Sequence, residues 1–155
     1  MRCFNSFRFR RETVVELTRA RARGRTLFFR TSTCSTCHAV GKEGGTIGPD
    51  LTTIGAIRPG RDLIESLVLP NATIAQQFET YAIITDEGKA HQGTLARRST
   101  ETIVLCDASG AELRVRTDAI EQMAVSQRSL MPDGLLAVLD RAEIRDLLAY
   151  LQSLR

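Results

Sequence analysis

The chain has 155 residues, of which 43% are hydrophobic and 25% charged, and its formal net charge is +3. This length and apolar content suit one globular domain with its own core and exclude a disordered chain. No apolar run is long enough to span a membrane, and residues 1–30 lack the apolar segment of a secretory signal.

The charge is unevenly distributed along the sequence. Residues 1–30 hold nine arginines against two glutamates, a net charge of +7, so the remaining chain carries −4. A basic amphipathic start can bind nucleic acid, anionic lipid or an acidic redox protein. We interpret it instead as a solvated helix face and expect no nucleic-acid partner. Residues 1–11 are expected to form a loose basic terminus, followed by a helix over about 12–29.

The sequence C-S-T-C-H joins Cys34, Cys37 and His38. A C-x-x-C-H pattern is typical of covalent haem attachment, because two thiols add to the porphyrin vinyl groups and the adjacent imidazole ligates the iron. On a helical turn, residues three and four apart share one face. The motif therefore predicts one covalently bound haem c per chain, tethered by Cys34 and Cys37 and ligated by His38.

Two other interpretations of the cysteine pair stay open. A thioredoxin-like dithiol expects a preceding strand within a βαβ unit, whereas this pair follows a basic helical stretch. A structural zinc site needs a fourth ligand, for which Cys106 and His91 are candidates, although neither belongs to a second paired motif. Either would make the chain a binding module. Cys3 and Cys106 are expected to be unpaired thiols.

The middle of the chain changes from a helical to an alternating pattern. A short helix is expected at about 61–69, ended by Pro70. From about 78 to 125 the alternation predicts four or five antiparallel strands, joined by turns rich in Asp and Gly. Met123 falls in the last strand as a packed side chain, and His91 falls at a polar strand edge, where we expect it to be exposed.

The last segment combines a methionine with a strong helix signal. Met131 lies in S-L-M-P-D-G-L. Asp140 with Glu143 three residues later predicts a capping box, which starts a terminal helix. Its apolar stripe consists of Ile144, Leu147, Leu148 and Leu151, joined by Tyr150.

Two of these segments resemble class I c-type cytochromes. G-G-T-I-G-P-D-L, residues 44–51, resembles the loop beside the haem, and S-L-M-P resembles the loop of the methionine ligand. The resemblance implies that the Pro49 carbonyl accepts a hydrogen bond from His38 and that Met131 is the second axial ligand. It also implies haem contacts from Ile47, Gly48 and Leu51.

The fold expected from this resemblance is a mainly α cytochrome c fold with an inserted small antiparallel β-sheet, α+β overall. The haem domain would span 12–155 and the insertion about 78–125. Gly24 and Phe28 would pack against the terminal helix. Landmarks such as D-L-T-T-I-G and L-V-L-P-N-A-T-I resemble the planctomycete- and verrucomicrobial-type haem-binding cytochrome c domain, from about Gly24 onward.

The function expected from the resemblance is a monohaem electron relay and not an enzyme. The domain would be the C-terminal part of a larger exported, for example periplasmic, redox protein, because haem attachment of this type takes place outside the cytoplasm. Its partner would be a redox protein or a fused dehydrogenase domain. If Met131 does not bind, the alternative is a haem enzyme or sensor with an open distal position.

Overall fold

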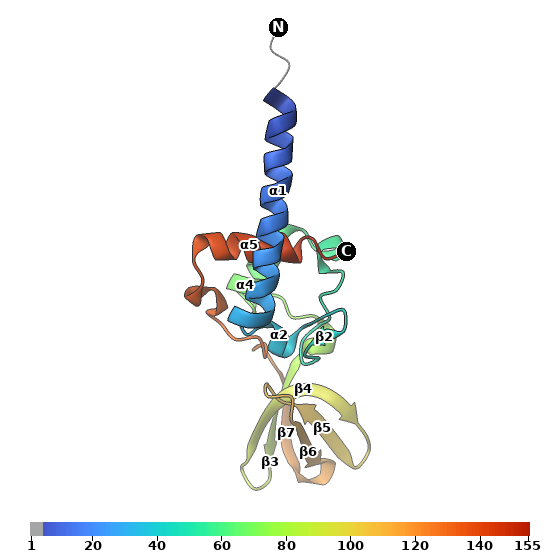
Figure 1. Ribbon diagram of the computed structural model, residues 1–155. Coiled ribbons are helices and arrows are strands. Elements are labelled where there is room, and N and C mark those ends of the chain that lie inside the picture. Colours follow the sequence, from blue (N-terminus) through green and yellow to red (C-terminus); the bar gives the residue numbers. More distant parts are fainter. Residues whose placement is uncertain (1–4) are drawn as a thin grey trace.

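A computed structural model describes the backbone of residues 5–155 and the side chains of residues 13–155. It shows a helical lobe, from which α1 projects, and a separate sheet lobe (Figure 1). No helix among the described residues is long and apolar enough to cross a membrane.

The helical lobe contains both ends of the described chain. The helix α1, Asn5–Thr26, continues into a π-helical turn, Leu27–Thr31, which is followed by α2, Cys34–Cys37. Two short strands, β1 at Ala39–Val40 and β2 at Glu43–Gly44, precede α3, Ile54–Ile57, and α4, Gly60–Val68. After the sheet, a 3₁₀ turn η4, Leu135–Val138, leads into α5, Arg141–Leu151.

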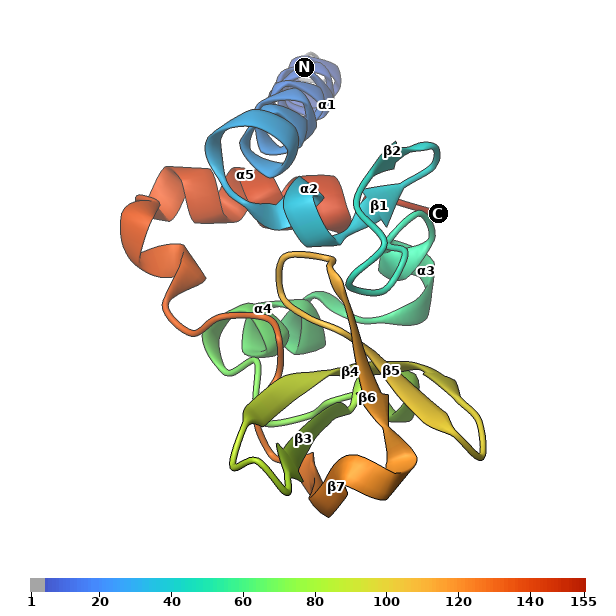
Figure 2. The same ribbon diagram turned by 90° about the horizontal axis from the view of Figure 1, so that it is seen from below.

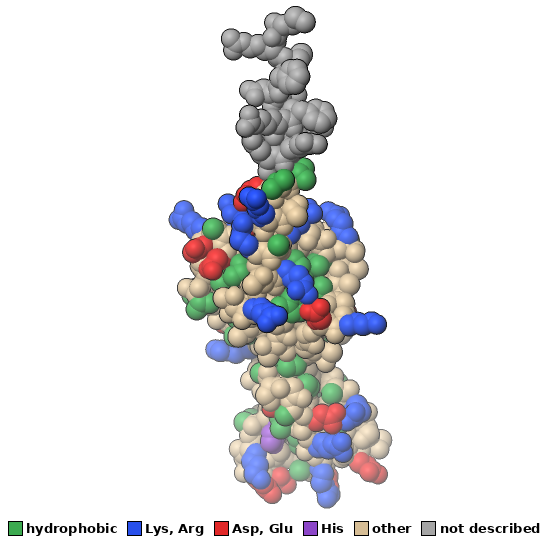
Figure 3. All heavy atoms as spheres, viewed as in Figure 1, with side chains coloured by type: hydrophobic (Ala, Val, Ile, Leu, Met, Phe, Trp, Pro, Cys, Tyr) green, Lys and Arg blue, Asp and Glu red, His purple; other side chains and the backbone are tan. Residues whose placement is uncertain are grey.

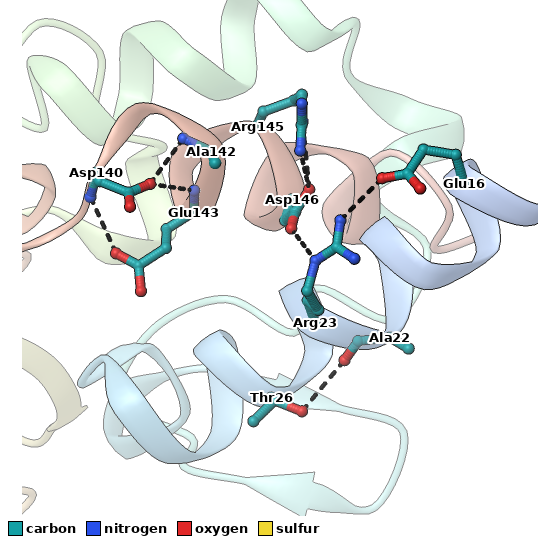
Figure 4. Close-up of polar contacts among 9 residues, drawn as sticks. All are labelled: Glu16, Ala22, Arg23, Thr26, Asp140, Ala142, Glu143, Arg145 and Asp146. Carbon is teal, nitrogen blue, oxygen red and sulfur yellow. Dashed lines mark hydrogen bonds and ion pairs between the residues drawn. The ribbon is translucent and has the colours of Figure 1, made fainter. Parts of the chain in front are cut away.

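The terminal helix α5 crosses α1, as expected, and its start has the predicted capping box. The Asp140 carboxylate accepts hydrogen bonds from the backbone N–H groups of Ala142 and Glu143 (Figure 4). The Glu143 carboxylate accepts one from the Asp140 N–H at 2.9 Å. Together these bonds satisfy N–H groups that a helix leaves unpaired in its first turn.

Buried side chains from the π-helical turn, α4 and α5 form one hydrophobic core, here called the helical core. Phe28 and Leu147 are each 1% exposed at its centre. The rings of Phe28 and Tyr150 lie 5.8 Å apart in a tilted arrangement, which confirms the expected packing of Phe28 on the terminal helix. The complete set is Leu27, Phe28, Leu63, Leu67, Leu147, Tyr150 and Leu151.

The sheet lobe is a five-stranded antiparallel sheet in the order β6-β5-β4-β3-β7. Gly88 and Gly110, with φ of +74° and +83°, occupy two of its turns, where left-handed backbone favours glycine. The strands are β3 Thr80–Thr85, β4 Ala90–Arg98, β5 Thr102–Cys106, β6 Glu112–Arg116 and β7 Ile120–Ser126.

The expectation of a mainly α fold was wrong. The strands bury a second hydrophobic core of Ile83, Ile103, Leu105 and Val115, here called the sheet core, which shares no residue with the helical core. The alternating stretch was correctly assigned to antiparallel strands, but it is a lobe with its own interior and not an accessory to a helical fold. The chain is therefore an α+β protein with two cores.

The boundaries of the predicted helices differ less from those in the structure. The helix expected at about 61–69 is α4, Gly60–Val68. The first helix begins at Asn5, so residues 5–11 are helical where a loose terminus was expected. Residues 1–4 of that predicted terminus, including Cys3, lie outside the described residues.

Candidate functional site

Cys34, Cys37 and His38 are brought together by one helical turn. The π-helical turn ends at Thr31, and α2 consists of Cys34–Cys37 alone. The His38 N–H donates to the Cys34 carbonyl at 2.9 Å, which closes this turn. Both cysteines are half-buried, and the Cys34 side chain packs against the helical core. The motif thus has the local geometry that its spacing predicts.

The two thiols do not have the lowered pKa that is typical of a redox dithiol. Cys34 and Cys37 are not joined to each other, and burial raises the pKa of both thiols above the ordinary value. A hydrogen bond with Ser32, at 3.1 Å, only partly opposes this effect at Cys34. Reactive dithiols depend instead on a lowered pKa, because the thiolate is the nucleophile. This environment does not favour the dithiol interpretation.

The zinc interpretation lacks ligands as well. Among the residues with described side chains, no group of three or more His, Cys, Asp or Glu could hold a metal ion. Cys106 ends β5, and His91 lies on β4, so both candidate fourth ligands belong to the sheet lobe. The structure does not bring them together with the cysteine pair.

The ring of His38 is held by the loop that follows it. Its Nδ1 lies 2.9 Å from the carbonyl oxygen of Pro49, the contact that the resemblance implies. Since a carbonyl only accepts, Nδ1 carries the proton and Nε2 keeps its lone pair. Burial lowers the pKa of His38, although the bond to Pro49 acts in the opposite direction. The neutral ring is the form that binds a metal.

Glycines allow this loop to pass close to the motif. A β-carbon on Gly48 would lie 2.7 Å from Cε1 of His38, and one on Gly45 would lie 2.0 Å from the Thr36 carbonyl oxygen. The Gly48 N–H donates to the Cys37 carbonyl at 2.8 Å, so the backbone itself wraps the cysteine turn. Side chains at these positions would displace the imidazole or the turn.

Two apolar residues of the loop face different surroundings. Leu51 packs against the helical core, whereas Ile47 approaches the sheet lobe. A β-carbon on Gly110, in the turn between β5 and β6, would lie 3.5 Å from Cδ1 of Ile47. Figure 2 shows this turn reaching toward α2 and the loop after it. The turn between β5 and β6 therefore lies close to the loop beside His38.

Met131 lies on the same core as the cysteine turn. Its half-buried side chain packs against the helical core, as that of Cys34 does. Asn71, for which no role was predicted, hydrogen bonds to residues on both sides of Met131. The segment L-V-L-P-N-A-T-I that contains it was noted only as a landmark.

The second histidine and the other methionine with a described side chain lie in the sheet lobe. His91 on β4 and Met123 on β7 both stand opposite Ile83, and opposed residues share a face of a sheet. Met123 packs against the sheet core, as expected. His91 is half-buried where an exposed position was expected. Neither belongs to the helical core.

The donor set and its surroundings suit a covalently attached haem. Two unpaired thiols stand three residues apart, and the adjacent imidazole has Nδ1 engaged and, within the described residues, Nε2 without a hydrogen bond. A thioether packs on the same core. Imidazole and thioether are both axial ligands of haem iron in c-type proteins. Cys34, Cys37, His38 and Met131 would hold the group, with Ile47, Gly48 and Leu51 as its expected neighbours.

A separate groove of about 760 Å³ lies on the sheet lobe and contains none of these residues. Arg97 and Arg114 in this groove share the carboxylate of Glu112. Figure 3 shows lysine and arginine side chains, with acidic ones beside them, on this lobe. The groove is lined by Arg97, Arg98, Ser99, Thr102, Val104, Arg114 and Arg116. It offers positive charge but no iron-ligating side chain.

Comparison with known protein families gives a match over most of the chain. The sequence model of the family described as Cytochrome c matches residues 21–155, from the C-terminal part of α1 to the last residue. No curated protein sequence matches the chain.

Proposed function

We propose that this chain, which belongs to the cytochrome c family, transfers single electrons through one haem c tethered by Cys34 and Cys37 and ligated by His38 and Met131. Family membership alone makes it a haem-binding electron-transfer domain. The observation that supports the finer assignment is the bond between His38 and Pro49, which leaves Nε2 available to iron.

The haem supplies reversible one-electron chemistry at iron. The protein would hold the haem and set its reduction potential. The Pro49 carbonyl fixes the His38 tautomer and makes the ring a better ligand. Leu51, on the helical core, and Ile47, under the β5–β6 turn, would limit the access of water. Exclusion of water is one of the means by which a protein sets a reduction potential.

Met131 completes the proposed ligand set. A soft thioether favours ferrous iron and raises the potential relative to a second imidazole. With both axial positions filled, no coordination site remains for a substrate. The chain would then act as a carrier and not as an enzyme, in agreement with the general role of cytochrome c domains.

We also propose a biological setting for this domain. Cytochrome c domains are usually exported, so we propose a periplasmic or other exported location. The two-lobed fold would be the planctomycete- and verrucomicrobial-type domain, placed at the C-terminal end of a larger redox protein. Its partner would be a redox protein or a fused dehydrogenase domain, with no role for nucleic acid.

The ligand assignment is tested on protein produced together with the cytochrome c maturation machinery. A pyridine haemochrome spectrum should show one covalent haem per chain, and Met131→Ala should abolish the methionine–iron charge-transfer band. Met123→Ala and His91→Ala are matched controls in the sheet lobe and should keep the band. A covalent haem whose band survives Met131→Ala would contradict His/Met ligation. Rapid stoichiometric binding of carbon monoxide by the reduced wild-type protein would instead support an open distal site.

A further inference from the structure

The segment that carries Met131 has few restraints of its own. It runs from the end of β7 at Ser126 to η4 at Leu135 and has no regular secondary structure. Among the described residues, no backbone–backbone hydrogen bond involves residues 127–133. The position of the Met131 backbone therefore depends on side-chain contacts.

Asn71 supplies these contacts from another part of the chain. Its Oδ1 accepts a hydrogen bond from the Ser129 N–H at 2.9 Å, and its Nδ2 lies 3.1 Å from both carboxylate oxygens of Asp133. The Ser129 hydroxyl in turn accepts from the Met131 N–H at 3.0 Å. One amide side chain thus engages the residues two before and two after Met131.

Asn71 is itself firmly placed. It follows Pro70, which is buried and whose ring fixes the backbone φ angle. Pro70 follows α4, whose Leu63 and Leu67 belong to the helical core. The N–H of Ala72 also donates to the Leu69 carbonyl at 3.0 Å, which closes a turn around Asn71. A chain of contacts thus leads from the helical core through Asn71 to the Met131 backbone.

We propose that Asn71 is a positioning residue that clamps the Met131 loop and so keeps the thioether on the iron. The inference rests on the proposed ligation by Met131 and adds what holds that ligand. The amide is suited to this position because it must accept from a backbone N–H and donate to a carboxylate at once. Neither alanine nor aspartate can do both.

The experiment uses the haem-loaded protein and imidazole as the probe, which competes with Met131 for ferric iron. Asn71→Ala should bind imidazole about tenfold faster than wild type, because the exposed hydrogen bonds of Asn71 to Ser129 and Asp133 are lost. Asn71→Asp places a second carboxylate beside Asp133 and should be faster still. The double variant Asn71→Asp with Asp133→Asn restores one donor and one acceptor between the two positions, and its rate should return to near the wild-type value.

Thr73→Ala is the matched control, because Thr73 is exposed in the same segment and makes no hydrogen bond within the described residues. It should leave the rate unchanged. Amide hydrogen exchange at Ser129, measured on the same samples, should accelerate in the two single variants and recover in the double variant.

The results of these experiments test the Asn71 clamp and the ligation by Met131 separately. If Met131→Ala abolishes the charge-transfer band while all Asn71 variants bind imidazole at the wild-type rate, the clamp is wrong and the ligation stands. If the band survives Met131→Ala, the ligation itself is wrong and the clamp has no ligand to hold. Failure of the double variant to recover, with its circular dichroism unchanged, would also overturn the clamp.

Discussion

The backbone of Gly24 in α1 lies directly against the carbonyl of Asp146 in α5. A β-carbon on Gly24 would lie 2.0 Å from that oxygen and 2.7 Å from Cβ of Tyr150. Beside this contact, Nε of Arg23 lies 2.5 Å from a carboxylate oxygen of Asp146 (Figure 4). The helix crossing that supports the cysteine turn is thus fixed by close approach and by charge at one point.

Gly24→Ala should destabilise the protein by at least about 2 kcal/mol, because the backbone oxygen it meets cannot rotate away as a side chain could. Helix propensity alone predicts a gain of about 0.5–1 kcal/mol from the same change. The free energy of unfolding in urea measures the result. The exposed substitution Ala22→Gly reports the propensity effect, with an expected loss of about 1 kcal/mol. An unchanged or more stable Gly24→Ala protein would contradict the close contact.

The same crossing should make stability depend on acid. The hydrogen bond from Arg23 lowers the pKa of the buried Asp146 carboxyl, and Arg145 assists. Because the folded pKa lies below the unfolded one, the stabilisation is complete above an ordinary Asp pKa of about 4 and is lost as the pH falls through the folded value. Unfolding free energies measured from pH 6 to about pH 2 should therefore fall less steeply for Asp146→Asn than for wild type.

At neutral pH, Asp146→Asn should cost about 1–3 kcal/mol, because a charged, buried hydrogen-bond acceptor is lost. Glu16→Gln is the control, since Glu16 also pairs with Arg23, at 3.2 Å, but both side chains are about half exposed. That substitution should change stability by less than about 0.5 kcal/mol. Equal pH slopes for Asp146→Asn and wild type would count against the pair.

Local signals in the sequence predicted much of this fold. The capping box at Asp140 and the turn at Gly88 are confirmed, and so is the packing of Gly24 and Phe28 on α5 that the resemblance implied. The first two depend on residue types at fixed short spacings. The bond between His38 and Pro49, implied by the resemblance, is confirmed as a contact. The roles of both residues toward a haem stay predictions.

What the sequence could not predict depends on distant contacts. The bond from Ser129 to Asn71 joins residues 58 apart, and an exposed asparagine after a proline looks like an ordinary turn. The approach of Gly110 to Ile47 depends on how the two lobes are oriented. The fold was wrongly predicted to be mainly α for the same reason. An alternating pattern predicts strands, but it does not show whether those strands enclose a core of their own.

Gly48→Ala should impair the proposed haem site. The new β-carbon would meet Cε1 of His38 at 2.7 Å and push the ring away from the Pro49 carbonyl. Loss of such an outer hydrogen bond costs about 10- to 100-fold in ligand affinity for a metal. The ratio of charge-transfer band to total haem should fall, whereas the exposed neighbour Thr46→Ala should keep it. A normal spectrum in Gly48→Ala would argue against the proposed role of this glycine.

Thr80→Val should stabilise the protein by about 1 kcal/mol. Thr80 is fully buried, and its Oγ1 has no hydrogen-bond partner in the part of the chain that the structure describes. Valine has nearly the same shape, suits a strand and removes the unsatisfied hydroxyl. Thr85→Val on the same strand is the opposite case, because Oγ1 of Thr85 accepts from the Lys89 N–H at 3.2 Å. Thermal unfolding should shift upward for the first variant and downward for the second.

Thr80 and Ser126 stand opposite each other on β3 and β7, so the chain enters and leaves the sheet lobe at one place. Paired residues in antiparallel strands have Cα atoms about 5 Å apart. A short loop could therefore bypass all five strands without altering the spacing between α4 and the Met131 segment. The sheet lobe, with its own hydrophobic core, is thus joined to the helical lobe where β3 begins and β7 ends, and its removal would also take away the Gly110 turn beside Ile47.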